Sequence, residues 1–339
     1  MTSATNHVSD PVDEAVRGCP APALRPYVAW YSGYRQCGVA PMVHRGLPSP
    51  YLTLILTLDD PLTLAAHPDP RQPPGSYRTL LGGLHTRPAL ITHAGYQSGV
   101  QIALSPLGAR VLLGLPAGEL AELDFAAEDV LGGWAVEGQE RLRYATDWPG
   151  RFAAVDRWLG ERLGQRAAEP APEVVRAWQL LLAGGGQPSA GELADRIGWS
   201  GRHLADRFRT EIGLTPKAAA RVIRFDRARR LLTARAGQPR SSYGPAEPDG
   251  GPARSGARGA AAGGLGLADL AAHCGYFDQA HLAREFRALA GCAPSRWVAD
   301  EAGALVTPAK RSAEERAARS SETSKAAPGR SAQAGGTPG

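Results

Sequence analysis

Residues 278–291 are Asp278-Gln-Ala-His-Leu-Ala-Arg-Glu-Phe-Arg-Ala-Leu-Ala-Gly291. Leu282, Phe286 and Leu289 recur at the i, i+4, i+7 spacing of one helix face. The opposite face is polar and basic. A shorter helical segment, 270–275, precedes it and closes on a glycine, as many helices do. Two short helices joined by a tight turn, the second of them basic, predict a helix-turn-helix unit.

The same pattern occurs earlier in the chain. Leu193, Ala194 and Gly198 recur 77 residues later. The second copy then has one extra residue, so the next five identities are 78 residues apart. In the first copy these five residues are His203, Leu204, Phe208, Gly213 and Pro216. Eight identities in one order, across both helices and the turn, indicate an internal duplication. The sequence therefore predicts two helix-turn-helix units, at 189–213 and 267–291.

These residues carry a resemblance to a known family. The shared features are Leu-Ala in each first helix, Gly-Trp or Gly-Tyr-Phe-Asp-Gln at the turn, and His-Leu-Ala-x-x-Phe-Arg followed by Gly-x-x-Pro. Between the repeats stands Arg224-Phe-Asp-Arg-Ala-Arg-Arg-Leu-Leu232. Over residues 173–234 and 265–302 the sequence resembles the AraC/XylS family of bacterial transcription regulators. The resemblance implies binding to promoter or operator DNA, and RNA polymerase as a partner that is activated or blocked.

Charge and cysteine usage agree with this expectation. Residues 189–300 hold 17 Arg and Lys against 11 Asp and Glu, whereas residues 1–188 hold 15 against 18. Positive charge thus accompanies the duplicated helices, as expected for a surface that faces phosphates. The four cysteines form no closely spaced pair, which fits a reducing cytoplasm. The sequence contains no run of eighteen apolar residues, so no membrane span is predicted.

The outward face of each second helix supplies the candidate DNA contacts. Arg202 and Arg284 could each donate two hydrogen bonds to guanine, and Gln279 could pair with adenine. Arg209 and Arg287 lie further along and are expected at phosphates. Asp206 could accept from cytosine or pair with Arg202 at i, i+4, and we favour the intrahelical pair. The full set of predicted DNA-binding residues is Arg202, His203, Asp206, Arg209, Gln279, Ala280, Arg284 and Arg287.

The helix between the repeats sets their spacing. Residues 215–234 form a predicted helix of 20 residues, about 30 Å at 1.5 Å per residue. Recognition helices that enter successive major grooves on one face of DNA lie about 34 Å apart. A rigid helix of this length is a plausible spacer. Residues 235–265 lack an apolar stripe and are predicted to be a disordered insert, which could weaken docking of the second unit on this helix.

The N-terminal half has the pattern of a β domain. Short apolar runs at 27–34, 51–58, 79–84, 89–93 and 99–104 are separated by Gly and Pro and suggest a sandwich or small barrel. The family resemblance implies a cupin-like barrel at this place. The expected organisation is a disordered start (1–20), a sensor domain (21–115), a helical segment (116–166), the DNA-binding domain (173–302) and a disordered tail (303–339). Residues 116–166 are expected either as a connector or dimerisation segment between the two halves or as helices that only cover the open side of the barrel.

The predicted fold class is therefore α+β multidomain, with a β-rich cupin-like sensor, a helical connector and an all-α tandem helix-turn-helix domain. His44 and Arg45 are candidate contacts for a small-molecule effector in the barrel. The alternative for this domain is one that only dimerises or binds a protein. No His-x-His occurs and no catalytic fingerprint is present, so we expect no cofactor, no metal, no catalytic residue and no enzyme activity. A cupin-like enzyme or metal-binding domain fused to a DNA-binding module is the rival interpretation.

Overall fold

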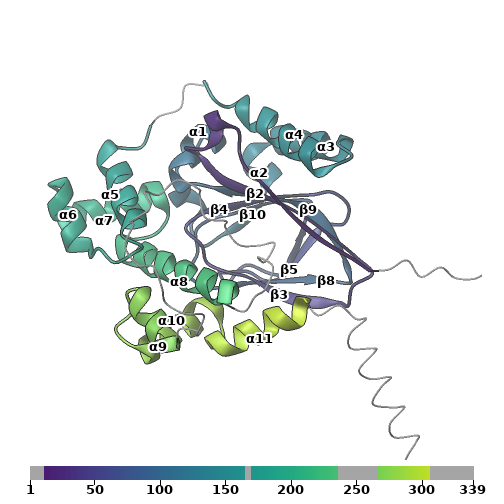
Figure 1. Ribbon diagram of the computed structural model, residues 1–339. Coiled ribbons are helices and arrows are strands. Elements are labelled where there is room, and N and C mark those ends of the chain that lie inside the picture. The colour runs from purple at the N-terminus through teal and green to yellow at the C-terminus, as the bar shows by residue number, and fades with distance from the viewer. Residues whose placement is uncertain (1–10, 165–168, 236–265, 306–339) are drawn as a thin grey trace, which may run out of the picture.

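The computed structural model describes residues 11–164, 169–235 and 266–305. Its N-terminal part is a sandwich of two antiparallel sheets, and the remainder is helical (Figure 1). The six-stranded sheet contains, in order, β1 (Val12–Gly18), β2 (Val28–Cys37), β9 (Tyr96–Leu104), β4 (Leu52–Thr57), β7 (Thr79–Gly82) and β10 (Asp124–Ala126). The four-stranded sheet contains β3 (Met42–Gly46), β8 (Ala89–His93), β5 (Leu62–Ala66) and β6 (Gly75–Tyr77). The predicted β-rich N-terminal domain and helical C-terminal half are confirmed.

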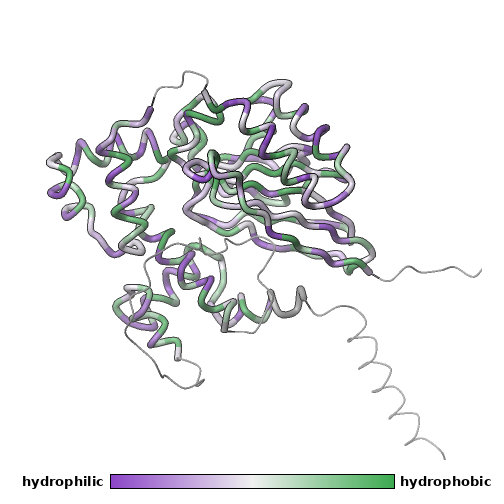
Figure 2. The backbone as a smooth tube through the Cα atoms, turned by 45° about the horizontal axis from the view of Figure 1, so that its top comes forward, coloured by the Kyte–Doolittle hydropathy of each residue, from purple (hydrophilic) through white to green (hydrophobic). Residues whose placement is uncertain are grey.

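The apolar run at 51–58 has a simple explanation in the sheet. It forms β4, which lies between β9 and β7 in the middle of the six-stranded sheet. Leu54 and Leu56 face the covering helices, whereas Ile55 joins the core between the two sheets. Because both faces of β4 are buried, the strand has no polar alternation. Figure 2 shows hydrophobic segments concentrated in these central strands.

The prediction of disorder for residues 1–20 is wrong for residues 12–18. They form the edge strand β1, which pairs with β2 from Val12 opposite Cys37 to Gly18 opposite Tyr31. The first four residues of β1 are exposed, so the strand buries almost no apolar side chain. Its order comes from the backbone ladder, which leaves no hydrophobic periodicity for sequence analysis to detect. Residues 1–10 lie outside the described residues.

Four helices follow the sheet residues and cover the outer face of the six-stranded sheet. They are α1 (Ala109–Leu113), α2 (Ala127–Leu131), α3 (Gly133–Tyr144) and α4 (Trp148–Gly160). Phe152, Val155, Trp158 and Leu159 form an apolar stripe on α4 that is buried there. Of the two positions expected for this segment, between the halves or over the open side of the barrel, the structure shows the second, because α3 and α4 pack on the sheet (Figure 1). The sheet buries the apolar faces of both helices. The helical segment also begins later than the predicted residue 116, because Asp124–Ala126 form β10, which pairs with β7 and so belongs to the sheet.

Seven helices form the C-terminal half. They are α5 (Pro172–Ala183), α6 (Ala190–Ile197), α7 (Gly201–Ile212), α8 (Pro216–Arg235), α9 (Leu267–His273), α10 (Gln279–Ala290) and α11 (Pro294–Leu305). A capping box of Ser189 and Glu192 begins α6. Gly198, Gly213 and Gly291 each end a helix with positive φ. The two segments predicted as helix-turn-helix units each contain two consecutive short helices, α6 and α7 in the first and α9 and α10 in the second.

Some predicted segments can be compared only in part. Helix α11 was not predicted, and it extends to Leu305, past the expected start of the tail at residue 303. The rest of the tail and the insert after Arg235 lie outside the described residues. Among the described helices, none combines the length and the apolarity that crossing a bilayer requires.

The close approach of α4 to β2 gives a test of the fold. A Cβ added at Gly33 would lie 2.3 Å from the ring of Trp148, which is buried. Gly33→Ala should therefore lower the free energy of unfolding by about 1–3 kcal/mol through overpacking. Urea denaturation of the two proteins measures the difference.

Gly160→Ala is the matched control, because nothing lies within 4 Å of its added Cβ at the end of α4. This control should unfold at the urea concentration of the wild type or slightly above it. Equal midpoints for Gly33→Ala and the wild type would show that Trp148 does not pack against β2 as described.

Candidate nucleic-acid interface and ligand cavities

Two buried aromatic side chains orient the recognition helices. Phe208 on α7 and Phe286 on α10 are fully buried, together with Leu204 and Leu282 one turn earlier. Phe286 meets Phe225 of α8 edge-on, with ring centroids 4.9 Å apart. With these faces fixed inward, the remaining faces of α7 and α10 point to solvent. The two helices thus present their polar sides as the sequence pattern predicts.

All eight of the predicted DNA-binding side chains are exposed on these faces. The exposed set is Arg202, His203, Asp206, Arg209, Gln279, Ala280, Arg284 and Arg287. The favoured ion pair between Arg202 and Asp206 is not formed, since no ion pair of the described residues joins them. Both side chains are solvated at the helix surface, where an i, i+4 pair gains only about 0.3–0.5 kcal/mol. They are free to meet a ligand.

The N-terminal turn of each recognition helix is built by a side-chain cap. Ser200 accepts from the backbone N–H of His203, and Asp278 accepts from that of His281 at 2.6 Å. The two histidines also pack on the preceding aromatic residue. His203 lies edge-on to Trp199 at 4.5 Å, and His281 to Tyr276 at 5.3 Å. The ring of His203 therefore packs against Trp199 although the residue is exposed, and the DNA contact predicted for it stays a prediction.

Helix α8 holds both units. It is 20 residues long, as predicted, and runs from Pro216 to Arg235. Arg221 of α8 pairs with Glu285 of α10 at 2.7 Å. Arg224 donates to the carbonyl of Gly186, which follows α5. The second unit is thus docked on α8 by a salt bridge and by aromatic packing, although residues 236–265 separate them in sequence.

The sensor domain touches the first unit through α7. Glu211 near the end of α7 is buried and accepts two hydrogen bonds from Arg110 of α1, at 2.7 and 2.9 Å. Gly118 packs so tightly on the end of α7 that an added Cβ would lie 2.3 Å from the carbonyl oxygen of Thr210. A buried, charge-assisted pair of this kind is costly to break from one side, by about 3–5 kcal/mol. The orientation of α7 is therefore tied to the sensor domain.

The sensor domain also touches α8 and α11. Arg45 on β3 pairs with Asp300 of α11 at 3.1 Å. Leu47 and Leu84 belong to the hydrophobic core of the C-terminal half. Burial raises the pKa of Tyr51, and the nearby carboxylate of Asp226 on α8 adds to this shift. The residues at one end of the sandwich thus form an interface with the C-terminal half.

The sandwich contains a larger cavity of about 290 Å³. Its wall combines aromatic, hydroxyl, amide and carboxyl side chains, among them Tyr34, Asp60, His93, Tyr96 and Gln97. His93 accepts from the backbone N–H of Gly95 through Nδ1. This volume is at the lower end of the range for ligand sites, which runs from about 300 to 1,000 Å³. A small polar molecule would fit it.

A second, inner cavity of about 60 Å³ lies between the sheets. It is lined by Trp30, Leu47, Tyr51, Gln101 and Asp124, among others. Trp30 and Gln101 are nearly fully buried, and neither Trp30 Nε1 nor Gln101 Oε1 has a hydrogen-bond partner in the structure. The volume accommodates only one or two water-sized groups. This cavity reaches the interface with the DNA-binding half through Leu47 and Tyr51.

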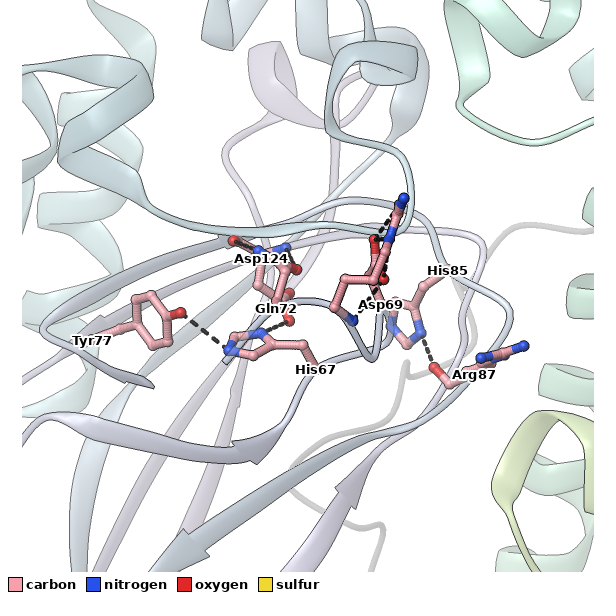
Figure 3. A network of polar contacts seen from close by, with 8 residues as sticks. His67, Asp69, Gln72, Tyr77, His85, Arg87 and Asp124 are labelled. Carbon is pink, nitrogen blue, oxygen red and sulfur yellow. Dashed lines mark hydrogen bonds and ion pairs between the residues drawn. The ribbon is translucent and has the colours of Figure 1, made fainter. Parts of the chain in front are cut away.

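A buried polar network closes one side of the inner cavity (Figure 3). His67 Nδ1 lies 2.8 Å from the carboxylate of Asp124, and His67 Nε2 lies 3.2 Å from the hydroxyl of Tyr77. Gln72 exchanges two hydrogen bonds with the backbone of Asp124. In the tautomer that fits both contacts, the Nδ1–H of His67 donates a hydrogen bond to the carboxylate of Asp124. Nε2 of His67 then accepts a hydrogen bond from the hydroxyl of Tyr77. The network joins the segment after β5 to β10 and was not anticipated, because nothing local in the sequence links His67 to Asp124.

The predicted effector contacts lie elsewhere. His44 shares the inner face of the four-stranded sheet with Ile91, and its ring centroid is 6.0 Å from that of His93. Neither His44 nor Arg45 lines either of the two cavities. Arg45 is engaged with Asp300 instead. Of the residues of β3, only Gly46 lines one of the two cavities, the inner one. His93, which the sequence analysis did not select, is the histidine at the larger cavity.

Metal binding has no support in the described part of the chain. No group of three or more His, Cys, Asp or Glu side chains there could hold a metal ion.

Residues 17–125 match a family described as a domain of unknown function, DUF6597. The match covers less than half of the chain, and it ends within β10. It therefore includes the strand that the sequence analysis placed in the connector. No curated protein matches the sequence.

The structure is similar to solved structures of ToxT from Vibrio cholerae. One, at 1.65 Å resolution, is 10% identical, covers 80% of this chain and 97% of that chain, and has a TM-score of 0.43. Another, from strain O395, holds (E)-4-(8-methylnaphthalen-1-yl)but-3-enoic acid. It is 11% identical, the match covers 80% of this chain and 98% of that chain, and the TM-score is 0.42. A third, from strain SCE256, holds an unsaturated fatty acid. It is 10% identical, the match covers 79% of this chain and 94% of that chain, and the TM-score is 0.41. At these scores the likeness says nothing about the ligand of this chain.

The environment of His44 predicts a pH dependence of stability. Burial lowers the pKa of His44 to about 4, and the nearby His93 adds to this. An unfolded histidine has a pKa near 6.5, so between about pH 6.5 and 4 the unfolded state binds more protons. The folded state should therefore lose stability as the pH falls through this window, by up to about 1.4 kcal/mol per pH unit for this group. Thermal unfolding of wild type and His44→Gln at several pH values measures it.

His44→Gln should show a shallower decrease of the unfolding temperature below pH 6.5. His203→Gln is the control, because His203 is exposed on α7. The control should follow the wild type. If His44→Gln and the wild type have parallel profiles, His44 is not held neutral by burial.

Proposed function

We propose that this protein is a sequence-specific DNA-binding transcription regulator of the AraC/XylS type, whose N-terminal domain responds to a small molecule. One observation carries the proposal: two helix-turn-helix units, docked on one 20-residue helix, each expose a recognition face with side chains suited to base reading. The family resemblance of the sequence supports the same conclusion independently. Such a regulator would act on RNA polymerase in the bacterial cytoplasm, as activator or repressor.

The two recognition faces differ, so we expect an asymmetric DNA site. Helix α7 offers Arg202 with Asp206 at the next turn, whereas α10 offers Gln279 with Arg284. Arginine prefers guanine in the major groove and glutamine prefers adenine. A single chain would therefore read two different base blocks about one helical turn apart. Homodimers, if formed, would bind two copies of this composite site.

The larger cavity is our candidate effector site. Its polar and aromatic wall suits a small hydroxylated or carboxylated molecule, and a ligand there would contact β4, β5 and β8. Strand β9, which also lines the cavity, leads to the segment that carries Arg110 and Gly118. Tyr51, which lies near Asp226 of α8, directly precedes β4. A ligand that shifts these segments would change how α7 and α8 are held. The buried pair of Arg110 and Glu211 is the contact through which we expect this change to reach the first unit.

The division between base-reading and phosphate-contacting arginines can be tested on α10. Selection from random double-stranded DNA should yield a motif for the wild type. For Arg284→Ala, the motif should lose preference at one or two adjacent base pairs, at a cost of about 1–3 kcal/mol for the preferred site. For Arg287→Ala, the motif should be kept, and affinity should fall about equally for all sequences, with a weaker salt dependence.

Arg157→Ala serves as the matched control, since Arg157 is an exposed arginine on α4, on the sheet-covering layer. This variant should keep both the motif and the affinity. A wild-type protein that enriches no sequence would refute the proposed function. An Arg284→Ala variant with an unchanged motif would refute the assigned role of Arg284 alone.

The effector site can be blocked at its mouth. Ala94 lines the larger cavity and is exposed, so Ala94→Trp should fill the entrance without disturbing the core. A thermal-shift screen with monosaccharides and small organic acids identifies a stabilising compound. At one hundred times its dissociation constant, a ligand stabilises the folded state by about 2.7 kcal/mol. The compound should stabilise Ala94→Trp far less than the wild type.

Ala183→Trp, at the exposed end of α5, is the control and should respond like the wild type. Equal stabilisation of Ala94→Trp and the wild type would place the ligand outside this cavity. In the wild type, the compound should also change affinity for the selected DNA, which a merely stabilising additive would not do.

A further inference from the structure

Phe277 is the most exposed large apolar side chain in the described part of the chain, with 92% of its surface accessible. It lies in the turn of the second unit, between the buried Tyr276 and the helix cap Asp278. Single exposed apolar residues are common and need no function by themselves. The position of this one, directly before a recognition helix, calls for an explanation.

Comparison of the two units shows that Phe277 is an addition. In the first unit, Trp199 is followed at once by the cap residue Ser200. In the second unit, Tyr276 and the cap Asp278 are separated by one residue. The spacing of the repeat changes from 77 to 78 residues at this point. The second unit therefore has one extra residue in its turn, and that residue is a phenylalanine.

The backbone that carries the ring is fixed on both sides. The N–H of Phe277 donates to Nδ1 of His281 at 3.2 Å, and the N–H of Tyr276 donates to the carbonyl of Ala271 at 2.9 Å. Asp278 caps α10 through the N–H of His281. The exposed ring thus projects from a hydrogen-bonded turn. Since it buries almost nothing, it adds little to folding stability.

We propose that Phe277 is an apolar DNA contact of the second unit, which packs on the C5-methyl group of a thymine beside the base pairs faced by Gln279 and Arg284. This inference rests on the proposed function and names a base class for that site. In helix-turn-helix proteins the N-terminal residues of the recognition helix meet base edges. Phenylalanine is among the side chains that contact the thymine methyl in the major groove. Exposed Ala280 next to it adds a second small apolar surface.

A protein partner is the less suitable occupant. Stable protein interfaces need a patch with several buried anchors. The other exposed large apolar side chains of the described residues are Val12, Val43, Tyr96, Val136, Tyr144 and Leu182. None of them belongs to α9, α10 or their turn. One ring beside a basic helix therefore suits a methyl group on DNA better than a protein surface.

The test uses the full-length protein and the DNA sequence that it selects. Each thymine of the selected site is replaced in turn by deoxyuridine, which lacks only the methyl group. At one thymine next to the block read by α10, the wild type should bind about four-fold more weakly, because burying one methyl group contributes about 0.8 kcal/mol. Phe277→Ala should bind the thymine and deoxyuridine versions of that site equally. Phe277→Leu should keep part of the difference.

Tyr144→Ala removes an equally exposed aromatic ring on α3 and should behave like the wild type. Unchanged thermal unfolding of Phe277→Ala would show that the variant is folded. The inference fails if no thymine replacement weakens binding by the wild type, or if Phe277→Ala preserves the thymine preference. It also fails if Phe277→Ala leaves DNA binding intact and instead loses binding to purified RNA polymerase. A wild type that selects no sequence refutes the proposed function, and that result is distinct from these.

Discussion

The rest of the C-terminal half depends on the burial of α8. Its apolar residues, including Val222, Phe225 and Ala228, are buried between the two helix-turn-helix units. It also buries a charge: the carboxylate of Asp226 is inaccessible and is paired with Arg229 at 2.6 Å. An unpaired charge there would be costly, so the pair constrains how α8 sits. Because Phe225 meets Phe286, α8 decides which face of α10 remains outside, and the tie of Arg221 to Glu285 fixes its position. The recognition faces are a consequence of this core.

Helix α8 also lies at the interface between the C-terminal half and the N-terminal domain. Tyr51 lines the inner cavity and lies near Asp226, so the interior of the sandwich borders the most constrained part of α8. A second connection runs from α1 to α7 through Arg110 and Glu211. A rigid interface with two charged anchors transmits displacements better than a flexible linker would, because packed contacts tend to change between discrete arrangements. In the proposed regulator, the effector acts on the orientation of α7 relative to α8, and the exposed side chains that meet DNA need not move individually.

The sequence was most informative where periodicity and repetition coincide. The duplicated pattern around Phe208 and Phe286 predicted both pairs of short helices and the faces that they expose. It was least informative where order comes from backbone pairing or from distant partners. Edge strand β1 buries few side chains, so it has no pattern, and β10 is too short to show one. His67, just after β5, meets Asp124 of β10, and Arg45 of β3 meets Asp300 of α11, because the fold brings together elements that are distant in sequence. The sequence shows the charge of Arg45 but neither its ion pair with Asp300 nor its place outside the two cavity linings, and its role as an effector contact stays a prediction.

The central claim is that one chain places two different recognition helices in successive major grooves. Methylation interference on the selected DNA site measures this directly, because methylation of guanine N7 blocks contacts in the major groove. Our account predicts two blocks of interference on one face of the DNA, centred about 10 base pairs apart, one helical turn, within a sequence that is not palindromic. Interference confined to a single block, or symmetric half-sites read by two copies of one helix, would contradict it.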